Sequence, residues 1–103
     1  MSSSAQNETL RAKLNLETAS IPWSELLRFF ASGTIIHVAS DLDLVEVATI
    51  MSNDDTATVA RWIEESRVAR VSDEQAQAWV ENDAEVWTVV VKPWILVQER
   101  QTH

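Results

Sequence analysis

The spacing of apolar residues near the start of the chain predicts an amphipathic helix. Leu10, Leu14 and Ile21 recur at intervals that fit one helical face. We expect this helix to span residues 7–19, because the asparagine at its start is a good N-cap.

Residues 22–39 predict a second helix followed by a strand. Proline suits the first turn of a helix, so Pro22 marks the start of the second one. Gly33 is the single glycine of the chain, and it falls where a left-handed cap would end this helix. The next run, TIIHVA, is rich in β-branched residues, which favours a strand over residues 34–39.

The middle of the chain has the pattern of two more helices joined by a polar turn. Ser40 or Asp41 can cap the first of them. The run SNDD ends that helix, and Asp54 or Asp55 can cap the next one. The apolar residues that we expect to face inward from this second helix are Val59, Trp62 and Ile63.

The last third predicts a short strand, a helix and one or two further strands. Residues 67–71 alternate apolar and basic side chains, as a half-buried strand does. Ser72 and Gln75 match a capping box that opens a helix. Residues 86–98 are nearly all β-branched or aromatic and predict a strand pair or one long bent strand, with their proline at an edge, bulge or turn. The alternative is that the preceding helix continues to about Val90.

Together these elements predict an α+β fold with about five helices on a three- to four-stranded sheet. We expect a single domain over residues 1–103, with an ordered core at about 7–99 and flexible tails at 1–6 and 100–103. A winged-helix-like arrangement of the middle segment, residues 42–71, is an alternative for that part of the fold.

Composition adds that the chain is acidic and that its acidity is local. The net charge of −8 arises in residues 41–85, which hold twelve acids against three arginines. Phosphate binding needs a basic face, so we expect no nucleic acid and no membrane among the partners. The absence of cysteine leaves no disulfide or thiolate site. Without a signal-like start or an apolar run near ~20 residues, the sequence predicts a cytoplasmic protein.

Five tryptophans in 103 residues are more than an average composition predicts. Tryptophan is highly buried on average, so most of these side chains are expected to fill the core. The tryptophans close to the C-terminus belong to a valine-rich strand whose edge must be covered. A partner protein could cover it, so these tryptophans could also lie at an interface. We name Trp87, Trp94 and Ile95 as interface candidates.

His37 with Asp41, Asp43 and Glu46 is the best candidate for chemistry. An imidazole that leaves a strand beside three carboxylates could bind a divalent metal or transfer protons. Capping and the helix dipole also place acids at the start of a helix, and this structural explanation weighs more. We therefore keep these four residues as catalytic candidates and predict no resident metal or cofactor.

Other chemistries lack their motifs. A single glycine excludes a phosphate-binding loop and a dinucleotide fingerprint. The paired aspartates after residue 53 lack the spacing of a calcium-binding loop. A recognition helix over residues 55–66 would carry Arg61 against three acids, so it would contact protein in preference to DNA.

Three segments are similar to a known bacterial family. They read IPWSELLRFFASG at 21–33, DLDLVEVA at 41–48 and KPWILVQ at 92–98. On these residues the chain resembles DUF family 2288, a bacterial domain of unknown function, from about Leu10 to Gln98. The resemblance implies a compact cytoplasmic bacterial protein, and it implies no activity, cofactor or site residue.

The favoured hypothesis is a small acidic, non-enzymatic protein-interaction module. Its partner would be a second copy, for example in a homodimer, or another protein. The alternative is a small acid-dependent enzyme or divalent-metal binder that uses His37, Asp41, Asp43 and Glu46. A nucleic-acid-binding regulator is the least favoured hypothesis.

Overall fold

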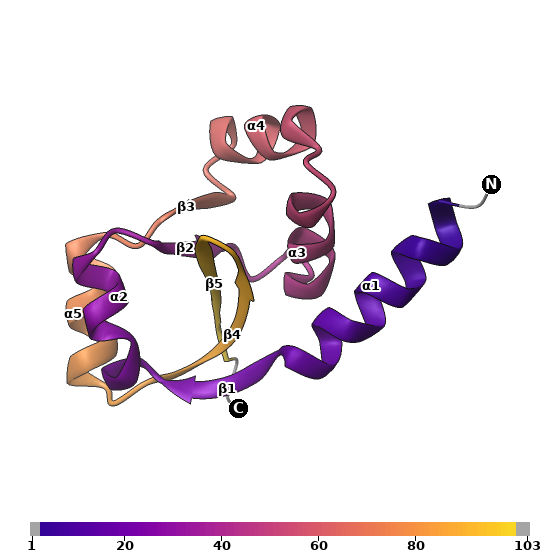
Figure 1. Cartoon of the computed structure of the whole chain (residues 1–103). Coiled ribbons are helices and arrows are strands. Elements are labelled where there is room, and N and C mark those ends of the chain that lie inside the picture. Colours follow the sequence, from indigo (N-terminus) through magenta and orange to yellow (C-terminus); the bar gives the residue numbers. More distant parts are fainter. Residues whose placement is uncertain (1–2, 101–103) are drawn as a thin grey trace.

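A five-stranded mixed sheet lies at the centre of the protein, with helices on both of its faces (Figure 1). The computed structural model describes residues 3–100, with side chains from Glu8 onward. The predicted α+β class is confirmed, and the described residues form five strands instead of three to four. In chain order the elements are α1 (Ser3–Glu17), β1 (Ala19–Pro22), the 3₁₀ helix η1 (Trp23–Leu26), α2 (Leu27–Ala31), β2 (Ile35–Val38), α3 (Leu44–Ser52), α4 (Thr56–Glu64), β3 (Val68–Arg70), α5 (Asp73–Glu81), β4 (Glu85–Val91) and β5 (Trp94–Glu99).

The strand order is β1-β4-β5-β2-β3, and all neighbours are antiparallel except β2 and β5. β4 and β5 form a hairpin in which Val91 pairs with Trp94, and Pro93 lies in the turn. The run 86–98 is therefore a strand pair. The alternative of a helix that continues to Val90 is wrong, because the β-branched side chains of β4 pair with both β1 and β5.

β1 is the strand that the sequence pattern does not reveal. Its four residues pair with β4, with Ile21 opposite Val86. We predicted Ile21 to belong to a helical face, but a run of four residues is too short to show the period of a strand. Pro22 ends β1 at the edge of the sheet, where the missing N–H leaves no hydrogen bond of the ladder unmade.

The first helix begins before its predicted start. α1 begins at Ser3 instead of Asn7, because the preceding residues include no proline or glycine that would stop a helix. Nη1 of Arg100, which belongs to the predicted C-terminal tail, donates a hydrogen bond of 3.1 Å to Ser20 Oγ. The flexibility predicted for residues 1, 2 and 101–103 concerns positions outside the described residues.

Alternation of side chains along the strands divides the interior into two cores. In β5, Leu96 faces α1 and α3, whereas Ile95 and Val97 face α2 and α5. The first core also holds Leu14, Val38, Leu44, Val45, Val47, Ala48, Trp62, Val68 and Val89. The second holds Trp23, Leu26, Ile35, Val71, Ala76, Trp79 and Val86. Because the central strands are buried on both faces, they appear in the sequence as nearly continuous apolar runs.

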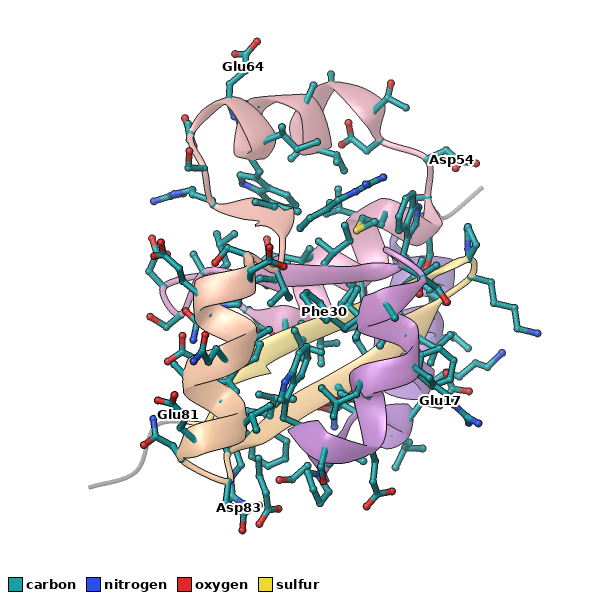
Figure 2. All side chains as sticks on the ribbon, turned by 90° about the vertical axis from the view of Figure 1, so that its left-hand side faces the viewer. Glu17, Phe30, Asp54, Glu64, Glu81 and Asp83 are labelled. Atoms are coloured by element: carbon teal, nitrogen blue, oxygen red, sulfur yellow. The ribbon has the colours of Figure 1, made fainter. Side chains whose placement is uncertain are left out.

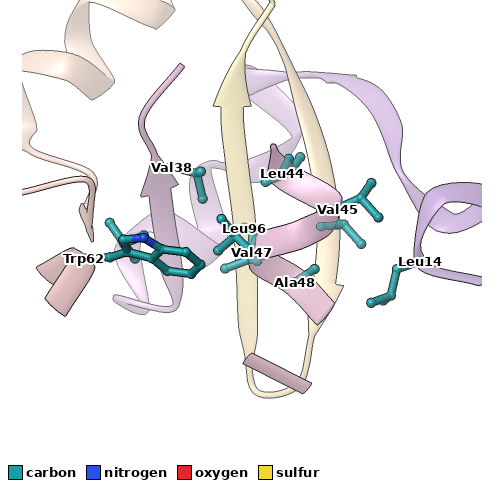
Figure 3. Close-up of a cluster of buried hydrophobic side chains, with 10 residues drawn as sticks. Leu14, Val38, Leu44, Val45, Val47, Ala48, Trp62 and Leu96 are labelled. Atoms are coloured by element: carbon teal, nitrogen blue, oxygen red, sulfur yellow. The ribbon is translucent and has the colours of Figure 1, made fainter. Parts of the chain in front are cut away.

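α4 lies at the β3 edge of the sheet and is held there mainly by one side chain. All nine residues of α4 are described, and Trp62 is the one that is buried. Figure 3 shows its ring directed toward Leu96 and Val47 in the first core. The helix, helix, short strand order is present, but β3 pairs with β2 and belongs to the central sheet. The winged-helix alternative is therefore not needed to explain the middle segment.

The helices in the described part of the chain lack the length and apolarity of membrane-spanning helices. Within residues 3–100, no helix is both long enough and apolar enough to cross a bilayer.

Left-handed backbone follows α2, α3, α4 and α5. Gly33 has φ 73° after α2, as predicted, and its lack of a Cβ makes this conformation favourable. The residues after α3, α4 and α5 are Asp54, Ser66 and Asp83, with φ of 57°, 59° and 50°. A side chain in this conformation costs about 1–2 kcal/mol, with a smaller cost for aspartate.

Ser66→Gly is expected to stabilise the fold by about 0.5–1 kcal/mol. Glycine removes the left-handed backbone cost, and part of that gain is offset by the greater freedom of the unfolded chain. Urea unfolding monitored by tryptophan fluorescence measures the change. Ser32→Gly is the matched control, since Ser32 has φ −79° and should lose stability. Equal destabilisation of both variants would contradict the explanation.

Candidate functional site

The three acids of the predicted catalytic group have different surroundings and do not form one cluster. Asp41 accepts a hydrogen bond of 2.8 Å from Arg67. Asp43, and not Ser40 or Asp41, caps α3 by accepting from two backbone N–H groups, and it also pairs with Arg11 at 2.8 Å. Glu46 is exposed in the first turn of α3. Among the described residues, no group of three or more acids and histidines is placed to hold a metal ion.

His37 lies on the other side of the sheet from α3. Val38 faces the first core, so its neighbour His37 faces α5. The imidazole meets the edge of the Trp79 ring at 5.6 Å between centroids, and its Nε2 lies 3.6 Å from Glu99 Oε1. The structure therefore does not bring His37 together with the acids of α3.

The three interface candidates have different surroundings. Ile95 is buried in the second core with 8% of its surface exposed, so it offers little surface to a partner. Trp87 is 39% exposed, and the guanidinium of Arg100 lies 5.3 Å from its ring centroid. Trp94 is half-buried and packs against the first core, beside α4. Trp94 is the candidate that lies at a hollow surface.

That hollow is an apolar groove between α4 and the sheet, which we call the α4 groove. It consists of two adjoining clefts of about 450 and 350 Å³ that share Met51, Val59, Ile63 and Trp94. Ile36 from β2 and Val68 from β3 complete its apolar lining. Figure 2 shows apolar side chains in the space between α4 and the sheet. The groove follows α4 across the ends of β5, β2 and β3.

Charged side chains of both signs border the α4 groove. Asp54, Asp55 and Lys92 line the cleft next to the β4–β5 turn, and Arg70 of β3 lines the adjoining cleft, with its Nη1 near Gly33. Hydrogen bonds from the backbone N–H and hydroxyl of Thr58 lower the pKa of Asp55, so this carboxylate is charged at neutral pH. No ion pair forms at Asp54, Lys92 or Arg70 among the described side chains.

Comparison with known proteins places the chain in a family. The sequence profile described as "Protein of unknown function (DUF2288)" matches residues 9–99. The chain belongs to this family. The resemblance seen in the three sequence segments is confirmed.

A solved structure supports the same fold for this DUF2288 protein. The NMR solution structure of PA1075 from Pseudomonas aeruginosa is similar with a TM-score of 0.79 and 42% sequence identity. The alignment covers 99% of this chain and 94% of PA1075. No curated protein matches the chain.

The apolar residues of α4 are the feature of this DUF2288 protein's sequence that points to the groove, but their spacing does not show which of them stay exposed. Val59, Trp62 and Ile63 were predicted to face inward together, but Ile63 is 57% exposed. When the apolar stripe of a helix is wider than its contact with the core, the apolar side chains outside that contact stay exposed. The position of α4 at the sheet edge decides which of these three side chains face the groove. That position is a property of the tertiary structure.

The stability of this DUF2288 protein is expected to fall on acidification through the titration of His37. Burial lowers the pKa of His37 below its ordinary 6.5, against a smaller opposing effect of Glu99. The unfolded chain therefore binds the proton more readily, so the free energy of unfolding decreases as pH falls through and below 6.5. His37→Gln should lose less stability than the wild type between roughly pH 7 and 5 in urea unfolding. Identical losses would contradict this origin.

Proposed function

We propose that this protein is a non-enzymatic interaction module that self-associates through the α4 groove. The observation that carries the proposal is an apolar groove bordered by charged side chains of both signs, of which Asp54, Lys92 and Arg70 form no ion pair with other described side chains. A second copy of the chain presents the same surface, so it supplies apolar side chains and both charges to complement it.

The apolar part of the groove supplies the attraction. Ile63 is more than half exposed, and it stands next to the half-buried Trp94 and Met51. Burial of apolar surface is favourable by about 25 cal/mol per Å², so an exposed cluster of this kind favours association. Aromatic residues and methionine are enriched at interfaces, which agrees with this lining.

The net negative charge of each copy opposes association, but several of the acids lie far from the groove, which limits the repulsion between copies. Each copy carries −8, but acids such as Glu81 and Asp83 lie at the end of α5, far from α4 in Figure 2. Glu64 points away from the groove in Figure 2. At physiological ionic strength charges are screened over about 8 Å, so remote acids contribute little repulsion. The balance favours a weak to moderate dimer.

Dilution monitored by NMR tests the proposal on the native chain. Signals of α4, β3 and the Trp94 indole N–H are expected to shift as the protein is diluted from the millimolar to the low micromolar range. The indole signals of Trp23 and Trp79, which are 0% and 4% exposed in the second core, should stay in place. The proposal fails if no signal shifts, or if the shifting signals lie on α2 and α5.

The compartment that we propose for this association is the bacterial cytoplasm. PA1075, the relative with a solved structure, comes from a bacterium. The chain has no cysteine, so its fold does not depend on an oxidising compartment. Cell fractionation is expected to recover the protein with cytosolic markers, and recovery with periplasmic markers would contradict the proposal.

A further inference from the structure

The larger cleft of the α4 groove combines an apolar lining with one cation. Its volume is about 450 Å³, within the range of roughly 300–1,000 Å³ that is typical of small-molecule sites. Among the described residues that line it, Arg70 is the one charged side chain, and all the others are apolar. Such a lining fits a small ligand with an apolar body and one negative charge.

Strand register places Arg70 on the face of the sheet that the groove covers. Arg70 pairs with Ile36 across β2 and β3, and Val68 lies two positions before it in β3. Paired residues, and residues two apart in a strand, direct their side chains to the same face of a sheet. Ile36 and Val68 belong to the first core on that face. The aliphatic stem of Arg70 therefore continues the floor of the cleft.

The guanidinium of Arg70 lies at the border of the cleft and is available to a ligand. Its Nη1 is 3.8 Å from the position that a Cβ at Gly33 would occupy, next to the start of β2. Arg70 is exposed and forms no ion pair with another described side chain. Arginine commonly lays its stem along apolar surface and keeps its charged head in water. A bound anion would therefore break no internal ion pair.

We infer that the larger cleft binds an aliphatic monocarboxylate, with its chain between α4 and the sheet and its carboxylate paired with Arg70. The planar fork of a guanidinium matches a carboxylate and binds it through two parallel hydrogen bonds. The chain contacts Met51, Val59 and Ile63, which line the opposite side of the cleft. Each buried methylene is expected to raise the affinity about two- to fourfold. This inference goes beyond the proposed function.

The charges around the groove select this site and a ligand with a single charge. Lys92 is the other cation that borders the groove, but Asp54 and Asp55 line the same smaller cleft. Two carboxylates beside one ammonium leave no positive excess there, so the anionic head of the ligand is directed to Arg70. The net charge of −8 also disfavours anions that carry several charges, such as phosphorylated compounds.

Titration of dilute protein with octanoate, followed by NMR, tests the site. The Trp94 indole N–H and the backbone N–H signals of Ile36, Ile63 and Arg70 are expected to shift until they saturate. The indole signal of Trp23, which is 0% exposed in the second core, should stay in place. Decanoate should bind more tightly than octanoate, by about two- to fourfold per added methylene. Octanol provides an uncharged probe with a similar chain.

Replacement of Arg70 by glutamine separates the role of the charge from that of the cleft. Arg70→Gln is expected to weaken octanoate binding roughly three- to tenfold and to leave octanol binding unchanged, because octanol lacks the carboxylate. Unchanged octanol binding also shows that the variant is folded. Arg28→Gln is the matched control on α2, which covers the opposite face of the sheet, and it should change neither affinity.

The outcomes distinguish this inference from the proposed function. Saturable binding of octanoate that depends on Arg70 supports the site, whereas shifts that do not saturate, or equal weakening by both variants, overturn it. A wild type that is monomeric at every concentration overturns the proposed function alone. Octanoate in the cleft covers Ile63 and Trp94, so it should lower the proportion of dimer in sedimentation equilibrium. An unchanged dimer with octanoate bound would rule out the α4 groove as the interface and leave the ligand site standing.

Discussion

Replacement of Ile63 by glutamate is expected to weaken self-association by about 10- to 150-fold. Ile63 is 57% exposed, so contact with a partner would bury roughly half of a side chain whose full burial is worth about 1.5–3 kcal/mol. The contact occurs twice in a twofold dimer, which makes the loss about 1.5–3 kcal/mol before any desolvation of the new carboxylate. Sedimentation equilibrium measures the dissociation constant.

Val80→Glu is the matched control for this substitution. Val80 is also on a helix and 53% exposed, but it belongs to α5 on the opposite side of the sheet. Its replacement adds the same charge without a change in the α4 groove. Equal weakening by both variants would mean that added negative charge, and not contact through Ile63, controls association.

Replacement of Trp62 by alanine is expected to lower the free energy of unfolding by about 3–5 kcal/mol. Trp62 is 8% exposed and packs in the first core, and a buried tryptophan leaves a large cavity when it is truncated. It is also the one buried side chain of α4, whose residues are all described. We expect hydrogen exchange in α4 to accelerate more than in α5, because α4 loses its anchor.

Trp87→Ala controls for the loss of an indole as such. Trp87 is 39% exposed, and its ring lies against the guanidinium of Arg100, so its truncation should cost about 0.5–1 kcal/mol. Chemical unfolding gives both values. Comparable losses for the two tryptophans, or uniform acceleration of exchange across the protein, would contradict the role of Trp62 as the anchor of α4.

Local signals in the sequence predict most of the fold. Gly33 has the left-handed backbone of a helix end, and Ser72 caps α5 by accepting from the N–H of Gln75. These features depend on interactions within a few residues, so a pattern can reveal them. β1 depends instead on pairing with β4, which is more than sixty positions away. Four residues carry too little local information to predict such a strand.

The predicted catalytic group illustrates a limit of sequence proximity. His37, Asp43 and Glu46 are close in the chain, but the side chain of His37 points to the face opposite α3. A one-residue difference in strand position changes the face, and the pattern TIIHVA leaves both faces apolar. The local alternative was that capping places acids at the start of a helix, and Asp43 has this role in α3, although Ser40 or Asp41 was the predicted cap.

The α4 groove could be predicted only in part. The sequence indicates a helix that follows Asp54 or Asp55 with Val59, Trp62 and Ile63 facing inward, and it names Trp94 as an interface candidate. Their meeting with Ile36 and Val68 depends on the order of strands in the sheet, which places β2 between β5 and β3. Non-local topology of this kind is not encoded in hydrophobic spacing.

Sedimentation equilibrium of the unmodified chain tests the central claim, self-association through the α4 groove, most directly. At high micromolar concentration we expect a mass approaching twice the 11.6 kDa of the chain, and a decline toward 11.6 kDa on dilution. The Ile63→Glu variant should remain close to 11.6 kDa under the same conditions. A wild type that sediments at 11.6 kDa over the whole concentration range would contradict the claim.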